Sequence, residues 1–208
     1  MFTNTTQFGG KFEHRLDAEL KNAEFAYIAS GYVGRDTVLN YEKEFLRMST
    51  LPSGYCKILV GMAYFEGLSP SSYNLLTNLN NNLSSNSQNS GVYLSYTQRY
   101  HGKIYNFGQN NSRNIYLGSS NFSQSGISSN VECTIEITDN NQKQNLINFT
   151  DFLFDPAHAV KIDKSNVIIH GSQRSKKQIS RASLAQLPRH RITLSQVHQR
   201  NIPYFDFD

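Results

Sequence analysis

Apolar residues gather in short runs that are separated by polar, turn-rich segments. Six of these runs are rich in β-branched and aromatic residues and are flanked by turn residues, which favours strands over helices. They cover residues 25–33, 56–62, 92–96, 104–107, 114–117 and 131–137. The pattern therefore predicts six largely buried strands.

Helical spacing appears between the predicted strands. Residues 36–48 place apolar side chains at helical intervals (Val38, Leu39, Phe45 and Leu46), with Asp36 as the N-cap. Residues 69–83 begin with Ser69 as N-cap and with Pro70 at the first helical position. The Asn- and Ser-rich segment 80–90 reads as the end of this helix running into a tolerant surface loop.

A third helix is predicted over residues 139–154. It turns its larger apolar side chains toward one side, and Pro156 stops it; these side chains are Leu146, Ile147, Phe149, Phe152 and Leu153. Strands and helices thus alternate along the chain. This order predicts an α/β layered domain whose strands are covered by helices on both faces.

Charge divides the 208 residues into two parts near Gly171. Residues 171–208 carry seven Lys/Arg and two acidic residues, a net charge of +5, whereas residues 1–170 carry 13 basic and 14 acidic residues, a net charge of −1. We therefore expect a domain over 1–170 and a basic linker or tail over 171–208. Such a tail either contacts nucleic-acid phosphates or is a solvated extension.

The two cysteines, Cys56 and Cys133, have no metal-ligand spacing and are too few for a disulfide framework, so we expect two core thiols in a reducing compartment. The first ten residues lack the apolar segment of a secretory signal, and no apolar run reaches the length of a membrane span. These features predict a soluble cytoplasmic protein without a membrane partner.

The chemically informative segment spans residues 100–136. His101 and Lys103 are two residues apart on a predicted strand, which points both side chains to the same face. A Gly-Ser turn with Ser119 and Asn121 ends the next apolar run, and Glu132 opens the strand after it. On adjacent strands, these five residues would form one site.

Their chemistry suits the transfer of a phosphoryl group. Lys103 supplies positive charge, while Asn121 and Ser119 supply hydrogen-bond donors for the charge that grows on phosphate oxygens. His101 can attack phosphorus or protonate a leaving oxygen, and Glu132 can orient a histidine. No cluster of Asp and Glu accompanies them, so we expect neither a two-metal mechanism nor a cofactor.

The segment resembles the signature of the phospholipase D superfamily, His-x-Lys followed by Gly-Ser-x-Asn. Within it, the chain is most similar to the metal-independent restriction endonucleases of the BfiI and NgoFVII type. The common version of the signature has an Asp shortly after the Lys, but here no Asp lies between Lys103 and Gly118. In the restriction-enzyme branch a Glu after the Asn, here Glu132, takes that supporting role.

The resemblance implies a phospholipase D-like layered sandwich, with a central mixed β-sheet flanked by helices. It also implies two facing motif sets and a phosphohistidine intermediate. None of the other histidines has a Lys two residues on (His14, His158, His170, His190 and His198). One set per chain then predicts a homodimer with the site on its two-fold axis.

By the same resemblance, the expected substrate is double-stranded DNA, and the expected function is that of the catalytic domain of a type II restriction enzyme. A DNA-recognition domain is expected beyond the linker. Two other functions stay open: a hydrolase of phospholipids or other small phosphodiesters, and a non-catalytic nucleic-acid-binding module.

Several residues carry a second interpretation. Glu136 lies on the same strand face as Glu132 and is the alternative carboxylate. Tyr32 and Tyr100 either line the site or pack beside it. Arg35 and Arg99 are either phosphate contacts or ordinary surface charges.

Overall fold

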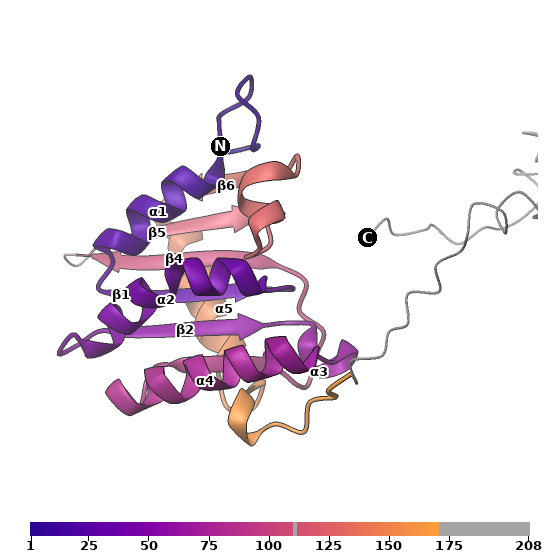
Figure 1. The fold of residues 1–208 in the computed structure, drawn as a ribbon. Helices are drawn as coiled ribbons and strands as arrows, with labels where there is room; N and C mark the ends of the chain where they lie inside the picture. Colours follow the sequence, from indigo (N-terminus) through magenta and orange to yellow (C-terminus); the bar gives the residue numbers. More distant parts are fainter. Residues whose placement is uncertain (110–111, 171–208) are drawn as a thin grey trace, which may run out of the picture. The chain divides into compact units, whose positions relative to one another are not determined.

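A seven-stranded mixed sheet forms the centre of the molecule (Figure 1), in the order β6-β5-β4-β1-β2-β3-β7. The computed structural model describes residues 1–109 and 112–170. Strands β1, β2 and β3 are parallel, and β4, β5, β6 and β7 pair antiparallel with their neighbours. The strands are β1 Phe25–Ser30, β2 Tyr55–Val60, β3 Gly91–Ser95, β4 Lys103–Gln109, β5 Ser112–Gly118, β6 Thr134–Ile137 and β7 Ala159–Lys161.

All six strands predicted from the sequence are present. The last begins later than expected, at Thr134, so that Glu132 lies before β6 and does not open it. The backbone of Glu132 donates to the Thr3 carbonyl at 3.3 Å, and Phe2 pairs with Thr134. Strand β5 ends at Gly118, the partner of Thr134, so the ladder with β6 ends there, and the N-terminal segment holds the residues before it.

Helices cover both faces of this sheet, as the sequence predicts. Figure 1 shows α1, α2 and α4 on one face and α5 on the other. Two buried clusters match these layers, one between the sheet and α1, α2 and α4, the other between the sheet and α5. The helical segments are α1 Phe12–Asn22, α2 Arg35–Thr50, α3 Ala63–Glu66, α4 Pro70–Asn86, α5 Asn140–Leu153, the π-helix Ser125–Ser129 and the 3-10 helix Ile162–Lys164.

One of the two predicted helix caps, Ser69, is confirmed, and Asp139 is a further cap that was not predicted. The Ser69 hydroxyl accepts from the backbone of Ser72, with Pro70 in the first turn. The Asp139 carboxylate accepts from the backbone of Gln142 at 2.8 Å. Asp36 is not a cap, because α2 begins one residue earlier and is preceded by Gly34, whose N–H donates to the Phe122 carbonyl at 2.7 Å.

The segment rich in Asn and Ser is more ordered than expected. Helix α4 continues to Asn86, and Asn80 within it is 1 % exposed. Its side-chain oxygen accepts from the backbone of Val92 at 3.0 Å. This bond ties α4 to β3, so Asn80 is a structural residue and not part of a tolerant loop.

Other side chains also depart from the predicted pattern. Cys56 is buried as expected, but Cys133 is exposed, because it lies in the segment before β6. Phe149 and Phe152 of α5 are 42 % and 43 % exposed, since only the Leu153 side of the helix faces the sheet fully. Helix α1 and strand β7 were not predicted.

Within the described residues, no helix is both long and apolar enough to cross a membrane. The predicted basic tail and its boundary near Gly171 lie outside the described residues and stay predictions.

Candidate functional site

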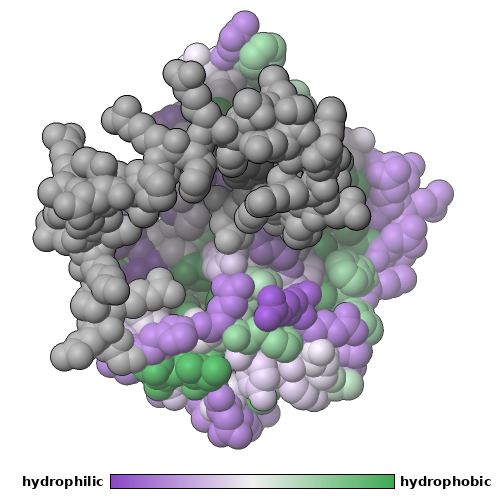
Figure 2. Space-filling model, turned by 90° about the vertical axis from the view of Figure 1, so that its right-hand side faces the viewer, coloured by the Kyte–Doolittle hydropathy of each residue, from purple (hydrophilic) through white to green (hydrophobic). Residues whose placement is uncertain are grey.

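The five predicted site residues lie at one edge of the sheet. Strand β1 ends where β4 begins, with Ser30 opposite Lys103, and Lys103 is in turn opposite Gly118 at the end of β5. Gly118 pairs with Thr134 at the start of β6. Figure 2 looks onto this edge, the right-hand side of Figure 1, and its coloured part mixes hydrophilic and hydrophobic residues.

His101 and Lys103 are in direct contact. The Lys103 ammonium is 3.1 Å from His101 Nδ1 and donates to the His101 carbonyl at 2.6 Å. His101 lies just before β4 and not, as had been predicted, within a strand, and its side chain is exposed. Lys103, the first residue of β4, is only 5 % exposed. Burial lowers the pKa of Lys103, and the charge of Glu132 opposes this shift. Lys103 thus contacts Nδ1, and Nε2 is the ring nitrogen that this contact does not engage.

Gly31, directly after β1, leaves the space that His101 occupies. A Cβ on Gly31 would lie 3.1 Å from both Cα and Cδ2 of His101, tighter than ordinary van der Waals contact. The ring of Tyr32 stands edge-on to the imidazole, with 5.5 Å between the centroids. The exposed Tyr32 therefore lines the site, whereas the buried Tyr100 packs beneath it.

Asn121 is held through its side-chain oxygen. The backbone N–H of Tyr32 donates to Oδ1 at 3.3 Å, and the Ser30 hydroxyl lies 3.4 Å from the same atom. Because a backbone N–H can only donate, the oxygen of the amide must face it. The NH₂ group of Asn121 is then the part that can donate to an anion.

Ser30 is a positioning residue that sequence reasoning missed. Its hydroxyl is fully buried, donates to the Tyr32 carbonyl at 2.7 Å and accepts from the backbone of Phe122 at 3.0 Å. It thereby fixes the end of β1 to the turn that carries Asn121. The available signal was a serine at the end of an otherwise apolar strand, which is too common to be specific.

Ser119 and Glu132 form the other pair of the site. The Ser119 hydroxyl donates to the Glu132 carboxylate and accepts from the backbone of Cys133 at 2.9 Å. Glu136, the alternative carboxylate, is instead 3.3 Å from the Arg15 guanidinium. The geometry thus brings Glu132, and not Glu136, to the Gly-Ser turn.

A buried hydroxyl network supports the turn from below. Ser120, between Ser119 and Asn121, is fully buried, and its carbonyl accepts from the Tyr105 hydroxyl at 2.7 Å. Its side chain accepts from the Thr134 hydroxyl at the same distance. Burial raises the pKa of Tyr105, so that its phenol stays a donor.

Taken together, one edge of the sheet brings together an exposed imidazole, a buried ammonium group and the amide donor of Asn121. This set can bind an anionic ester and attack it. Among the described residues, no group of three or more His, Cys, Asp and Glu side chains could hold a metal ion. Arg99 lies exposed nearby on the chain, and Arg35 begins α2.

Comparison with known proteins gives one family. A family model described as the NgoFVII restriction endonuclease N-terminal PLD domain matches residues 12–168. No curated protein matches the chain.

Three solved structures are among those that resemble it. Polyphosphate kinase from Porphyromonas gingivalis is 12 % identical with a TM-score of 0.49, over 84 % of this chain and 26 % of the kinase. Nuc from Salmonella typhimurium, a phospholipase D family member, is 12 % identical with a TM-score of 0.48, over 76 % of this chain and 91 % of Nuc. NucT from Helicobacter pylori is 15 % identical with a TM-score of 0.49, over 72 % of this chain and 91 % of NucT. The chain thus spans about a quarter of the kinase.

Proposed function

Because the chain belongs to the family of the NgoFVII restriction endonuclease N-terminal PLD domain, we propose that it is the metal-independent catalytic domain of a restriction enzyme that cuts double-stranded DNA. It is an enzyme of the phosphodiesterase and endonuclease class. The observation that carries the finer proposal is the 3.1 Å contact between His101 and Lys103 at the strand ends that also present Ser119 and Asn121. As a restriction enzyme it would act on DNA in the prokaryotic cytoplasm, and this location is part of the proposal.

The first step is attack by His101 on the scissile phosphorus. For this step the neutral imidazole carries its proton on Nδ1, and the Lys103 ammonium turns from Nδ1 to the phosphate. The Nε2 lone pair then forms a nitrogen–phosphorus bond, and the bond to the leaving ester oxygen breaks. Lys103 and the Asn121 amide stabilise the negative charge on the non-bridging oxygens. In this role the partly buried ammonium is well suited, because a charge held away from water interacts more strongly with phosphate.

The leaving oxygen needs a proton, and the chain has only one His-x-Lys set. We assign the proton to His101 of a second copy, so the catalytic unit is a homodimer. In the second step, that histidine takes a proton from water, and the resulting hydroxide attacks the phosphohistidine. The nitrogen–phosphorus bond breaks, and both histidines return to their starting state.

The five site residues of one chain are then half of the catalytic site, here called the half-site. The surface next to the half-site supports the pairing of two copies. Val131, Ile135 and Leu117 are 82 %, 40 % and 36 % exposed, and Leu117 lies directly opposite Ile135. They flank Ser119 and Glu132 in the sequence. Neighbouring apolar side chains left in water favour burial against a partner.

The test is nicking of plasmid DNA in excess EDTA by the wild-type protein, His101→Ala and His14→Ala. His14 is an exposed histidine on α1 and serves as the matched control. We expect EDTA-resistant nicking that is lost in His101→Ala and kept in His14→Ala. Loss of nicking in EDTA would refute the metal-free mechanism.

Other outcomes would point to other functions. Turnover of phospholipid without nicking would favour a small phosphodiester hydrolase, and binding without turnover would favour a non-catalytic module. For the dimer, we expect a bifunctional maleimide to link two copies through the exposed Cys133, beside the site, and Cys133→Ser to prevent it. A monomer with full activity would contradict the shared site.

A further inference from the structure

The connection between β3 and β4 runs along the same edge of the sheet as the site. Tyr96 follows β3, His101 precedes β4, and Arg99 lies between them. The backbone of Tyr100 is anchored to the Gly61 carbonyl at 3.3 Å. Strands β1 and β2 lie between β4 and β3, so the two ends of the connection are about 14 Å apart at the usual strand spacing.

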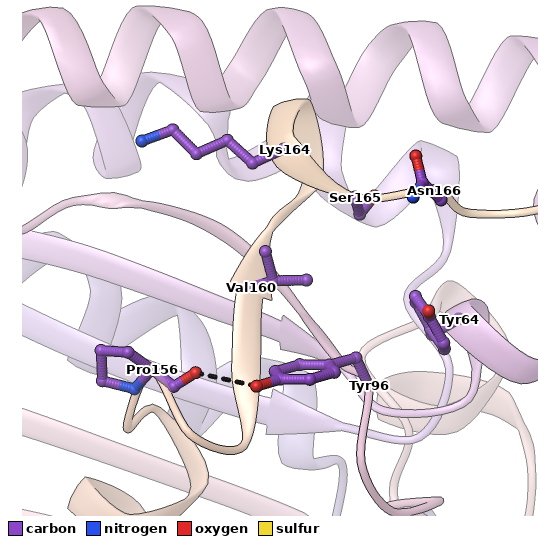
Figure 3. Close-up of a pocket in the computed structure, with 7 residues that line it drawn as sticks. All are labelled: Tyr64, Tyr96, Pro156, Val160, Lys164, Ser165 and Asn166. Atoms are coloured by element: carbon purple, nitrogen blue, oxygen red, sulfur yellow. Dashed lines mark hydrogen bonds between the residues drawn. The ribbon is translucent and has the colours of Figure 1, made fainter.

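The Tyr96 end of this connection borders a surface hollow of about 190 Å³. Its lining is Tyr64, Tyr96, Pro156, Val160, Lys164, Ser165 and Asn166 (Figure 3). In Figure 3 the two tyrosine rings bound the hollow on two sides, Val160 on a third, and Ser165 and Asn166 on the fourth. The hollow is separate from the half-site, because it lies at the β3–β7 end of the sheet.

The two rings form a fixed corner. Their centroids are 6.2 Å apart and their planes are at 67°. The Tyr96 hydroxyl donates to the Pro156 carbonyl at 3.1 Å, which holds its ring in place. Each ring is half-buried, so each keeps part of its face toward the hollow.

Polar groups lie at the rim and not on the ring faces. Asn166 is exposed and offers both a donor and an acceptor. The Lys164 side chain extends away from both rings in Figure 3, so its ammonium is a rim charge. The Ser165 hydroxyl already donates to the Ile162 carbonyl at 2.8 Å.

Arg99 is positioned between the hollow and His101. It is exposed, and its guanidinium carbon lies 5.6 Å from the centre of the Phe65 ring. Phe65 contacts Tyr64 with 5.6 Å between centroids. The order along the edge is therefore an aromatic hollow, an exposed cation and the exposed imidazole.

We propose that the Tyr64–Tyr96 hollow binds an unstacked nucleobase of the strand being cut, with Arg99 on a backbone phosphate between that base and the scissile bond. This inference rests on the proposed function, because it takes DNA as the substrate. A flat ring with a hydrogen-bonding edge fits two tyrosine faces and one amide. A lone phosphate does not fit, since the nearest ammonium extends away from the rings. At about 3.4 Å per nucleotide, the 14 Å spacing places the base roughly four nucleotides from the cut.

The test uses the full chain carrying His101→Ala, which binds without cutting, and a single-stranded 12-nucleotide DNA. Tyr64→Ala in this background should weaken binding by about 5- to 150-fold, the usual effect of losing one base–aromatic stack. Tyr73→Ala is the matched control, because Tyr73 is also a half-buried tyrosine packed against the same core. It should leave binding unchanged.

An abasic scan of the oligonucleotide identifies the base. At one position, removal of the base should weaken binding to the His101→Ala protein, which keeps Tyr64. At the same position it should not weaken binding further when Tyr64→Ala is also present. Equal losses for Tyr64→Ala on every oligonucleotide, or unchanged binding, would overturn the proposal. A second measurement needs no change at Tyr64: 2-aminopurine at that position should be quenched on binding, and quenching at no position would overturn the proposal too.

The two proposals fail differently. If the wild-type protein nicks plasmid DNA in EDTA but the hollow gives neither signal, only the base site is wrong. If it neither nicks nor binds DNA, the proposed function is wrong.

Discussion

Gly102, between His101 and Lys103, has no room for a side chain. A Cβ there would lie 2.6 Å from the Tyr100 hydroxyl, 2.7 Å from Cζ and 2.8 Å from Cε2. The ring is rigid and 9 % exposed, and it packs against Phe149. On its other side, the Tyr100 carbonyl already lies close to Gly61, where a Cβ would approach it to 1.9 Å. In Gly102→Ala, either the Tyr100 ring or the segment that carries His101 has to move.

Both movements have measurable consequences. Overpacking of this kind costs about 1–3 kcal/mol, which for a domain of this size lowers the melting temperature by roughly 2–12 °C. A shift of about 1 Å in His101 lowers kcat by about 100-fold. We therefore expect Gly102→Ala to melt earlier and to nick plasmid DNA in EDTA at a rate about two orders of magnitude below wild type.

A second substitution separates the cause from general damage. Tyr100→Leu makes room beneath residue 102, so Gly102→Ala with Tyr100→Leu should nick faster than Gly102→Ala alone. Thermal melts and initial nicking rates of wild type, both single variants and the double variant measure this coupling. Wild-type kcat and melting temperature in Gly102→Ala, or a double variant no better than the single one, would refute the reasoning.

Three other substitutions probe the site and the fold. Lys103→Met should abolish nicking yet melt at the same temperature or higher at pH 7, because burial lowers the pKa of this lysine; a large drop in melting temperature would contradict this. Between the lowered pKa of Lys103 in the folded protein and the ordinary value of about 10.4, the unfolded chain binds more protons at this group than the folded chain does. The free energy of unfolding of the wild type should therefore rise with pH in that window, and that of Lys103→Met should rise less. Urea titrations at several pH values measure this difference. Ser119→Ala removes one hydrogen bond to the Glu132 carboxylate, which is worth about 1.5–3 kcal/mol, and should lower kcat by about 10- to 150-fold. The control Glu136→Gln changes a carboxylate away from the turn and should nick DNA at the wild-type rate. Asn80→Leu leaves the buried Val92 N–H without its acceptor, so the free energy of unfolding should fall by about 1–3 kcal/mol. The variant's kcat should be unchanged, and a changed kcat would mean that α4 acts on the site.

The sequence predicted those parts of the fold whose pattern is local. β-Branched runs located six strands, and Ser69 marked the start of α4, because a cap acts within one turn. Helix α1 was missed although Phe12, Leu16 and Leu20 recur every four residues and are fully buried, so a helical signal existed among its charged residues. Strand β7 has three residues and pairs only with β3, and so short a run gives no pattern.

The same distinction holds for the candidate site. The contact between His101 and Lys103 follows from their spacing, and so does the placement of Asn121 after a strand. The choice of Glu132 over Glu136 does not, since it depends on Arg15 of a distant helix. Ser30 was also beyond prediction, because its contacts with Asn121 and Phe122 join residues about 90 positions apart in the chain. Their catalytic roles stay predictions until the variants are assayed.

The antiparallel pair of β1 and β4 brings Ser30 opposite Lys103, and all of β2, β3, α2 and α4 lie in the intervening chain. Contacts that close so long a loop form slowly, because the chain loses conformational entropy on closure before the contacts stabilise it. Helices and the β1–β2 pair can form while the ends of β1 and β4 are still apart. On refolding from denaturant, enzymatic activity should therefore return after helical structure does, and the candidate site reports on the last stage of folding.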